Sequence, residues 1–146
     1  MKRIVKIVLL SFIILLFNPF SVLASDGSIV ADSSTDWDPV MNAIIYVESR
    51  GYEKAVSGNS VGAMQITPIL IVECNNLLKK KKSKKRFKLS DRFSISKSKE
   101  MFLLIQSYYN PTNNIEKAIR MWNGGFNYSV KRTQKYFERV MTALKH

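Results

Sequence analysis

From residue 36 onward, the chain is dominated by apolar positions spaced three or four residues apart, which is the spacing of one helix face. The first segment shows this pattern at four positions: Val40, Ala43, Ile44 and Val47. Pro39 suits the first turn of a helix, and Gly51 suits the position beyond its end. We therefore predict a first helix that ends just before Gly51.

Four more segments show the same periodicity, and each is bounded by residues that start or stop helices. Thr67-Pro68 begins the second helix. Asn113 and Glu116 have the spacing of a capping box and are expected to begin the fourth, and Ser129 is expected to cap the fifth. The pattern predicts an all-α single domain over residues 36–146, with at most a minor strand element.

The N-terminal residues follow a different pattern. A short basic segment precedes an almost wholly apolar run that ends at Phe17 and is shorter than the roughly 20 residues a membrane-spanning helix needs. Val22 and Ala24 fit the two specificity positions of a signal-peptidase site. We predict a signal peptide over residues 1–24, a flexible lead-in over residues 25–35, and a secreted or periplasmic domain.

The counts of reactive residues restrict the chemistry. The chain has one cysteine, Cys74, which lies among apolar helical positions and is expected to be a buried structural thiol. Its one histidine, His146, is the last residue, a poor place for a catalytic base. Cys–His and Ser–His–Asp catalysis and His/Cys zinc sites are therefore disfavoured. We expect no metal and no cofactor, so that any chemistry depends on carboxylates.

The formal net charge of the chain is +12. Much of it comes from the segment Lys79-Lys80-Lys81-Lys82-Ser83-Lys84-Lys85-Arg86, which continues to Lys88. Such a balance favours a polyanionic partner. An exported protein seldom meets nucleic acid, so we expect a monomer that binds an anionic wall or membrane surface. For the lysine segment itself, the first interpretation is a solvated, self-repelling linker between helices, and the second is a patch that docks on the wall or membrane surface.

One acid stands out from the rest by its position. Glu48 lies in the last turn of the first predicted helix, where the helix dipole presents partial negative charge. Apolar neighbours such as Ile44 and Val47 would also remove water from the carboxyl group. Both effects raise its pKa from about 4.3 towards the range of a general acid for glycosidic cleavage. Arg50 would oppose the shift if it folded back. Taken alone, the segment fits an ordinary solvated glutamate better.

Three further motifs favour a catalytic role for Glu48 over that of an ordinary solvated glutamate. Gly62-Ala63-Met64-Gln65 ends a glycine-punctuated loop, Trp122-Asn123-Gly124-Gly125 ends the fourth predicted helix, and Tyr136 lies in the last one. With Glu48-Ser49 before them, these motifs resemble the soluble lytic transglycosylase family, whose domain is similar to goose-type lysozyme. The resemblance covers residues 37–143 and implies a lysozyme-like transglycosylase domain.

The resemblance also implies roles for individual residues. It makes Glu48 the catalytic acid and base, and it assigns substrate binding to Ser57, Met64, Gln65, Trp122, Asn123 and Tyr136. Ser57 and Gln65 would bond sugar or N-acetyl groups, while Met64 would shape the cleft floor. Asn123 would contact the saccharide or hold Glu48, and Tyr136 would line the cleft near the carboxyl group.

Three positions depart from the family pattern. Ala63 stands where the family usually has leucine, and Tyr52-Glu53 stands where Asn-Pro is common. Trp122 stands where the family usually has tyrosine, which removes a hydroxyl group and enlarges a stacking face. Glu53 is consequently a second acid close to the predicted site.

The activity implied by the resemblance is cleavage of the MurNAc–GlcNAc β-1,4 bond of peptidoglycan, with formation of 1,6-anhydro-MurNAc ends. A single carboxylate suffices for this reaction, whereas hydrolysis with inversion or retention requires two. Two alternatives remain open. One is a lysozyme-like hydrolase that recruits Glu53, Glu73 or Asp91. The other is a non-catalytic wall-binding module in which the basic segment dominates.

Overall fold

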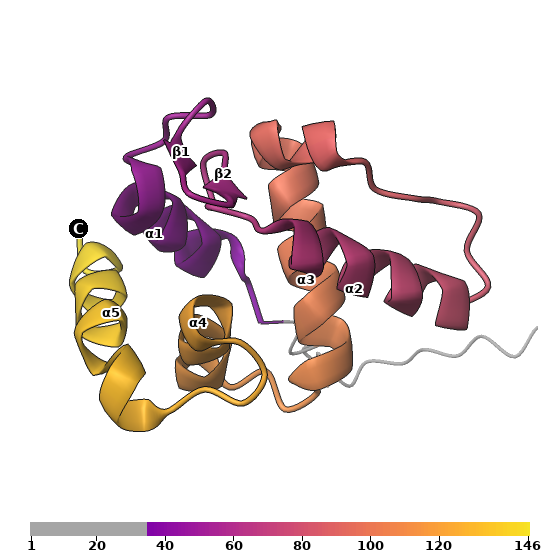
Figure 1. The fold of residues 1–146 in the computed structure, drawn as a ribbon. Helices are drawn as coiled ribbons and strands as arrows, with labels where there is room; N and C mark the ends of the chain where they lie inside the picture. The colour runs from indigo at the N-terminus through magenta and orange to yellow at the C-terminus, as the bar shows by residue number, and fades with distance from the viewer. Residues whose placement is uncertain (1–34) are drawn as a thin grey trace, which may run out of the picture. The chain divides into compact units, whose positions relative to one another are not determined.

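The computed structural model describes residues 35–146 of the chain. This part contains five α-helices, one short 3₁₀ helix and one two-stranded sheet (Figure 1). The elements follow in the order α1 (Asp38–Ser49), β1 (Val56–Ser57), β2 (Ser60–Val61), α2 (Pro68–Lys80), η1 (Leu89–Phe93), α3 (Ile95–Tyr109), α4 (Ile115–Gly124) and α5 (Val130–Ala143). The predicted all-α class is confirmed, and the antiparallel β1–β2 hairpin is the minor strand element. The predicted signal peptide lies outside the described residues.

Most helices begin where the local sequence predicts. The Thr67 side chain accepts a hydrogen bond from the backbone of Leu70 at the start of α2, and Ser129 caps α5 in the same way. The capping box predicted at Asn113 is wrong. The cap of α4 is Asn114, whose side chain accepts from the backbone N–H of Lys117 at 2.8 Å. Asn113 instead turns the chain with a φ of 53°, which delays the helix by one residue.

The hydrophobic core gathers side chains from all five helices. Figure 1 shows α5 running beside α1 and α4, while α2 lies against α3. Phe102 of α3 is completely buried, with the ring of Trp37 at 5.6 Å on one side and that of Trp122 at 5.3 Å on the other. Cys74 is buried here as predicted, and burial raises the pKa of its thiol to about 12. The thiol therefore contributes packing rather than reactivity.

The hairpin is held against η1 by close backbone contact. Gly62 follows β2 with a φ of +80°, and a Cβ at this position would lie 1.8 Å from the carbonyl oxygen of Arg92. The Arg92 guanidinium donates to the carbonyl oxygens of Asn59 and Ile66, both at 3.2 Å. Periodicity does not predict η1, because it is a single short turn fixed by these distant partners. Within residues 35–146, no helix is long and apolar enough to cross a membrane.

Candidate active site

The carboxyl group of Glu48 is held by a tyrosine from the last helix. Glu48 is partly buried in the final turn of α1, and its Oε1 accepts a hydrogen bond from the Tyr136 hydroxyl at 2.8 Å. Tyr136 is only 7% exposed, so its hydroxyl needs a partner inside the protein. Burial and the adjacent carboxylate raise the pKa of Tyr136 far above its usual range. The tyrosine consequently acts as a permanent donor to Glu48.

The environment of Glu48 favours the protonated acid, but it also contains two groups that stabilise the charged carboxylate. Burial raises the pKa of Glu48, because desolvation penalises the charged form. The Tyr136 hydrogen bond and the positive charge of Arg139 act in the opposite direction and keep the rise moderate. Arg139 also donates to the carbonyl oxygen of Val47 at 2.9 Å, one of the free carbonyls at the end of α1.

The cation that acts on Glu48 is therefore Arg139, not Arg50. Arg50 takes a left-handed φ of 53° at the end of α1, and its guanidinium lies 5.4 Å from the ring centre of Tyr46. The sequence contained a signal for the correct residue. Arg139 follows Tyr136 by three positions, which places both side chains on one face of α5.

Ser49 connects the end of α1 to the second motif. Its hydroxyl donates to the carbonyl oxygen of Ala63 at 2.8 Å and accepts from the backbone N–H of Gly51 at 3.2 Å. Gln65 ends the motif with a φ of 50°, and its side-chain nitrogen donates to the carbonyl oxygen of Gly62 at 2.9 Å. The loop is thus held to α1 at one end and closed on itself at the other.

The third motif meets the second through Trp122. Its indole nitrogen donates to the carbonyl oxygen of Met64 at 3.2 Å. The tryptophan that departs from the family pattern therefore supplies a hydrogen-bond donor as well as a flat face. Met64 itself is completely buried, so its side chain supports this loop from within the core.

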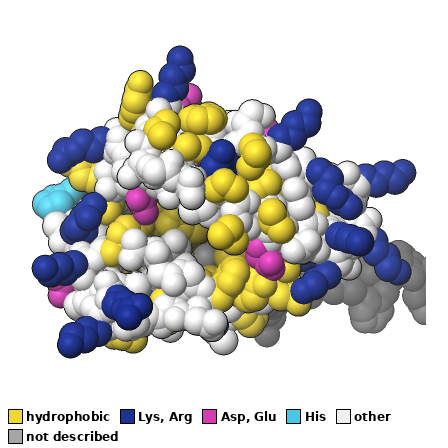
Figure 2. Space-filling model, in the orientation of Figure 1, with side chains coloured by type: hydrophobic (Ala, Val, Ile, Leu, Met, Phe, Trp, Pro, Cys, Tyr) yellow, Lys and Arg dark blue, Asp and Glu magenta, His cyan; other side chains and the backbone are white. Residues whose placement is uncertain are grey.

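A groove of about 290 Å³ lies where the second and third motifs meet. Gln65, Trp122 and Asn123 all line it. The remaining lining residues are mostly apolar: Ile66, Thr67, Ile69, Leu70, Glu73, Ile105, Met121, Gly125 and Phe126. Figure 2 shows that this side of the molecule is hollowed near its centre, with hydrophobic side chains in and beside the hollow, while most Lys and Arg side chains lie along the outline of the molecule.

The structure does not gather all the predicted residues in one place. Asn123 is exposed in the groove, and within residues 35–146 its side chain makes no hydrogen bond to Glu48. Ser57 lies exposed on β1, among no groove residues. Of the acids considered for a second role, Glu53 is exposed after α1, and Asp91 accepts from the backbone of Lys88 at 2.8 Å. Glu73 alone among them lines the groove.

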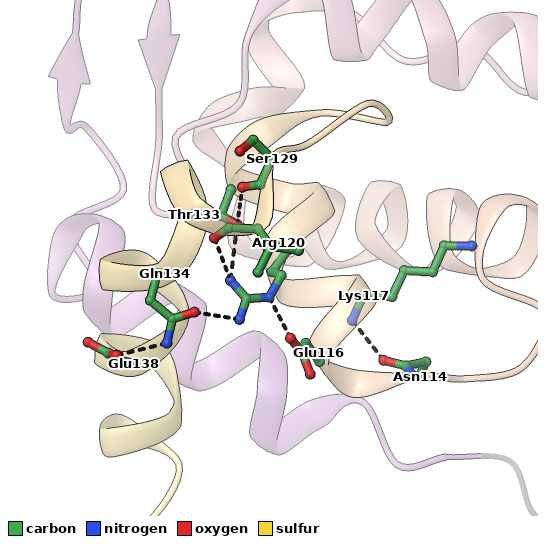
Figure 3. Close-up of polar contacts among 9 residues, drawn as sticks. Asn114, Glu116, Lys117, Arg120, Ser129, Thr133, Gln134 and Glu138 are labelled. Atoms are coloured by element: carbon green, nitrogen blue, oxygen red, sulfur yellow. Dashed lines mark hydrogen bonds and ion pairs between the residues drawn. The ribbon is translucent and has the colours of Figure 1, made fainter.

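A buried arginine that the sequence analysis did not identify fixes α5 against α4 (Figure 3). Arg120 is 3% exposed, and its Nε donates to Glu116 at 2.7 Å. Its terminal nitrogens donate to Thr133 at 3.2 Å and to Gln134 at 2.8 Å. Because α5 carries Tyr136, this network also sets the position of the hydroxyl that binds Glu48. The glutamate four residues before Arg120 was the available signal.

No family model, curated protein or solved structure matches this chain. The described residues form an all-α domain in which Glu48 is hydrogen-bonded to Tyr136, and Ser49 next to it bonds the loop that leads to the groove of Gln65, Trp122 and Asn123. Neither Glu48 nor Tyr136 lines that groove.

Replacing Tyr136 with phenylalanine should raise the pKa of Glu48 further. The substitution removes a donor that stabilises the charged carboxylate, while the burial that disfavours the charge remains. A pH titration of the Glu48 carboxyl carbon by NMR measures the shift directly. Tyr128→Phe is the control, because this partly buried tyrosine packs on the same core. A Glu48 pKa that falls or stays constant in Tyr136→Phe would contradict the assigned hydrogen bond.

Proposed function

We propose that this protein is an exported peptidoglycan lytic transglycosylase with a lysozyme-like domain. The observation that carries the proposal is the hydrogen bond between the Glu48 carboxyl group and the Tyr136 hydroxyl. A partly buried carboxyl group with a raised pKa is the kind of acid that glycosidic cleavage requires. The predicted signal peptide over residues 1–24 supports a secreted or periplasmic location, where the substrate occurs.

The proposed reaction uses Glu48 twice. Protonated Glu48 first donates to the glycosidic oxygen between MurNAc and GlcNAc, and the C1–O bond breaks as the GlcNAc hydroxyl leaves. The N-acetyl group of the substrate stabilises the oxocarbenium ion. The Glu48 carboxylate then accepts the proton of the C6 hydroxyl, whose oxygen bonds to C1 and closes the 1,6-anhydro ring. Tyr136 and Arg139 stabilise the carboxylate between the two steps.

The groove supplies chemistry that suits a sugar strand. Saccharides are bound by amide and hydroxyl groups together with flat apolar faces, and Gln65, Asn123 and Trp122 provide the amides and one such face. Ser57, on the neighbouring hairpin, is proposed to bond an N-acetyl or hydroxyl group farther along the strand. Met64 supports the loop that presents Gln65. No metal or cofactor takes part in the proposed reaction.

The proposal predicts a specific product. Mass spectrometry of the fragments released from purified glycan strands should find 1,6-anhydro-MurNAc ends and no new reducing ends. The rival is a lysozyme-like hydrolase, which the presence of Glu73 in the groove favours. A hydrolase would give reducing ends, and Glu73→Gln would abolish its activity. For the transglycosylase, Glu73→Gln should retain most of the activity. Reducing ends as the main product would overturn the proposal.

The basic segment extends the proposal to an anionic partner. Residues 79–88 are proposed to hold the domain at the cell wall or at an anionic membrane surface, with no role in binding nucleic acid. A non-catalytic wall-binding module would need the same segment, but it would have no use for a buried acid held by Tyr136.

A further inference from the structure

The basic segment is solvent-exposed, but it is not a free linker. α2 continues to Lys80, so Lys79 and Lys80 belong to the helix. The loop that follows is fixed at its far end by Phe87, which is 5% exposed. The backbone N–H and carbonyl of Phe87 bond to the Asn75 side chain at 2.8 and 2.9 Å. The first two lysines consequently have fixed places relative to the groove.

Lys79 and Lys80 stand on the same face of α2 as a groove residue. Glu73, Asn76 and Lys79 follow one another at intervals of three residues, and Lys80 lies about two turns after Glu73. Together the four residues line a shallow hollow of about 450 Å³. Glu73 also lines the groove of Gln65, Trp122 and Asn123. The two hollows therefore adjoin at Glu73, and a strand that leaves the groove along α2 reaches the lysines.

An aromatic ridge leads to the same place from the other wall of the groove. Phe126, which lines the groove, stacks on Tyr109 at 4.1 Å with an angle of 29° between the rings. Tyr109 meets Tyr108 edge to face at 4.9 Å. The Lys80 ammonium group lies 5.1 Å from the ring centre of Tyr108 and 3.4 Å from its hydroxyl. We call the shallow hollow of Glu73, Asn76, Lys79 and Lys80, together with the aromatic ridge that contacts it, the trough.

Charge is distributed unevenly along the trough. Near the groove, Glu73 accepts a hydrogen bond from the Tyr109 hydroxyl at 2.5 Å. At the far end, Lys80 donates to the Tyr108 hydroxyl, and within residues 35–146 neither Lys79 nor Lys80 makes a salt bridge. Lys85 differs, because it is paired with Glu100. The two helical lysines are therefore not neutralised by a salt bridge within residues 35–146 and are able to bind an anion.

The surroundings of the lysines favour an anionic strand over a membrane. Binding at a membrane surface combines cationic side chains with apolar groups that enter the lipid. Residues 79–88 include a single apolar side chain other than those of the lysine stems, that of Phe87, and it is buried. The strongly exposed aliphatic residues of α2, Ile69 and Val72, lie about two turns or more before Lys79. The exposed ring beside Lys80 is that of Tyr108, whose polar hydroxyl accepts a hydrogen bond from the lysine.

We propose that the trough is a binding site for carboxylate groups that the substrate strand carries outside the cleaved sugars, with Lys79 and Lys80 as their ligands. This inference rests on the proposed function, because peptidoglycan strands bear short peptides with free carboxylates. The sugar lies at Trp122 and Asn123, the amide-rich peptide follows the aromatic ridge, and its carboxylate meets the two ammonium groups.

The test compares two ligands and two matched variants in the full chain. The ligands are soluble glycan strands with native peptides, and the same strands after conversion of their free carboxyl groups to amides. Lys79→Gln/Lys80→Gln removes the two positive charges of the trough. Lys82→Gln/Lys84→Gln removes the same charge from the exposed loop outside it. All proteins also carry Glu48→Gln, so that the strands stay intact while binding is measured.

The trough variant should bind native strands about fivefold more weakly at low salt, as expected for the loss of two exposed ion pairs. It should bind the amidated strands as tightly as its parent does, and the loop variant should match the parent with both ligands. If the trough variant and the loop variant lose the same affinity for native strands, the attraction is diffuse and the proposal is wrong. If the trough variant loses the same affinity for native and for amidated strands, the lysines do not bind the carboxylates and the proposal is also wrong.

Two other outcomes separate the causes of a failure. If the parent binds anionic phospholipid vesicles and both double variants lose that binding, the basic segment is a membrane surface and the trough proposal is wrong. If the wild-type protein cleaves no strand and the parent binds neither ligand, the proposed function itself fails before any lysine is changed. Normal cleavage with no preference for native over amidated strands would overturn the trough alone.

Discussion

Glu48→Gln should abolish lytic activity while the fold and the binding of glycan strands are retained. The amide keeps the size of the carboxyl group and accepts the Tyr136 hydrogen bond, but it neither delivers nor takes up the catalytic proton. General acid–base catalysis contributes about 10²–10⁴-fold, and the loss should reach the upper part of this range because one group serves both steps. Release of soluble fragments from purified sacculi measures the activity, and circular dichroism checks the fold.

The same substitution should change stability in a pH-dependent way. Burial raises the pKa of Glu48 in the folded protein above its value in the unfolded chain. As the pH rises through this interval, the unfolded chain releases its proton first, and folding loses stability. Glu48→Gln has no proton to lose. It should therefore be more stable than the wild type at neutral pH in urea unfolding, and its advantage should disappear below about pH 4, near the unperturbed carboxyl value.

Glu53→Gln is the matched control for activity. Glu53 lies exposed five residues after Glu48, and a transglycosylase has no use for a second carboxylate there. Activity should remain close to that of the wild type. If Glu53→Gln is inactive and Glu48→Gln is active, the catalytic acid is Glu53 and the assignment of Glu48 is wrong. Loss in both variants, with reducing-end products from the wild type, would make the protein a two-carboxylate hydrolase.

The helices were predictable from the sequence because their signals are local. Periodicity and the caps at Thr67 and Ser129 depend on residues three or four positions apart, and both caps are present in the structure. The position at which α2 ends was harder to predict, because the lysines at its end resemble a solvated linker. They remain helical because cations suit the negative end of the helix dipole, and the contact of Lys81 with Ser107 holds that end on α3.

The site was predictable only where one segment contains the signal. Burial raises the pKa of Glu48, and apolar neighbours on the same helix indicated that burial in the sequence. Tyr136 was predicted from the family resemblance. Arg139 and Arg120 were missed because their roles depend on how α5 lies against α1 and α4. Arg50 was expected to lower the pKa of Glu48 only if it folded back, and in the structure its guanidinium lies over the Tyr46 ring. Its left-handed backbone directs the side chain to Tyr46, a turn that sequence proximity does not reveal.

The largest effect on stability should come from a glycine of the second motif. In Gly62→Ala, the new Cβ would lie 1.8 Å from the backbone carbonyl oxygen of Arg92, and the φ of +80° is unfavourable for any side chain. A backbone atom cannot rotate away as a side chain does, so the hairpin and η1 must separate. Overpacking and backbone strain each cost about 1–3 kcal/mol, which predicts a total loss of about 3–5 kcal/mol.

Gly58→Ala separates these two contributions. Gly58 also has a positive φ, of +56°, but a Cβ there would meet no atom within 4 Å. This variant should lose only about 1 kcal/mol, the cost of the backbone conformation alone. Urea unfolding of both variants measures the difference, and similar losses would contradict close packing of the hairpin on η1.

Gly62→Ala should also lose activity beyond its loss of stability, because a shifted loop displaces the carbonyl of Ala63 that Ser49 binds and the carbonyl of Met64 that Trp122 binds. The motif glycine thus holds the end of α1 and the groove in one fixed arrangement.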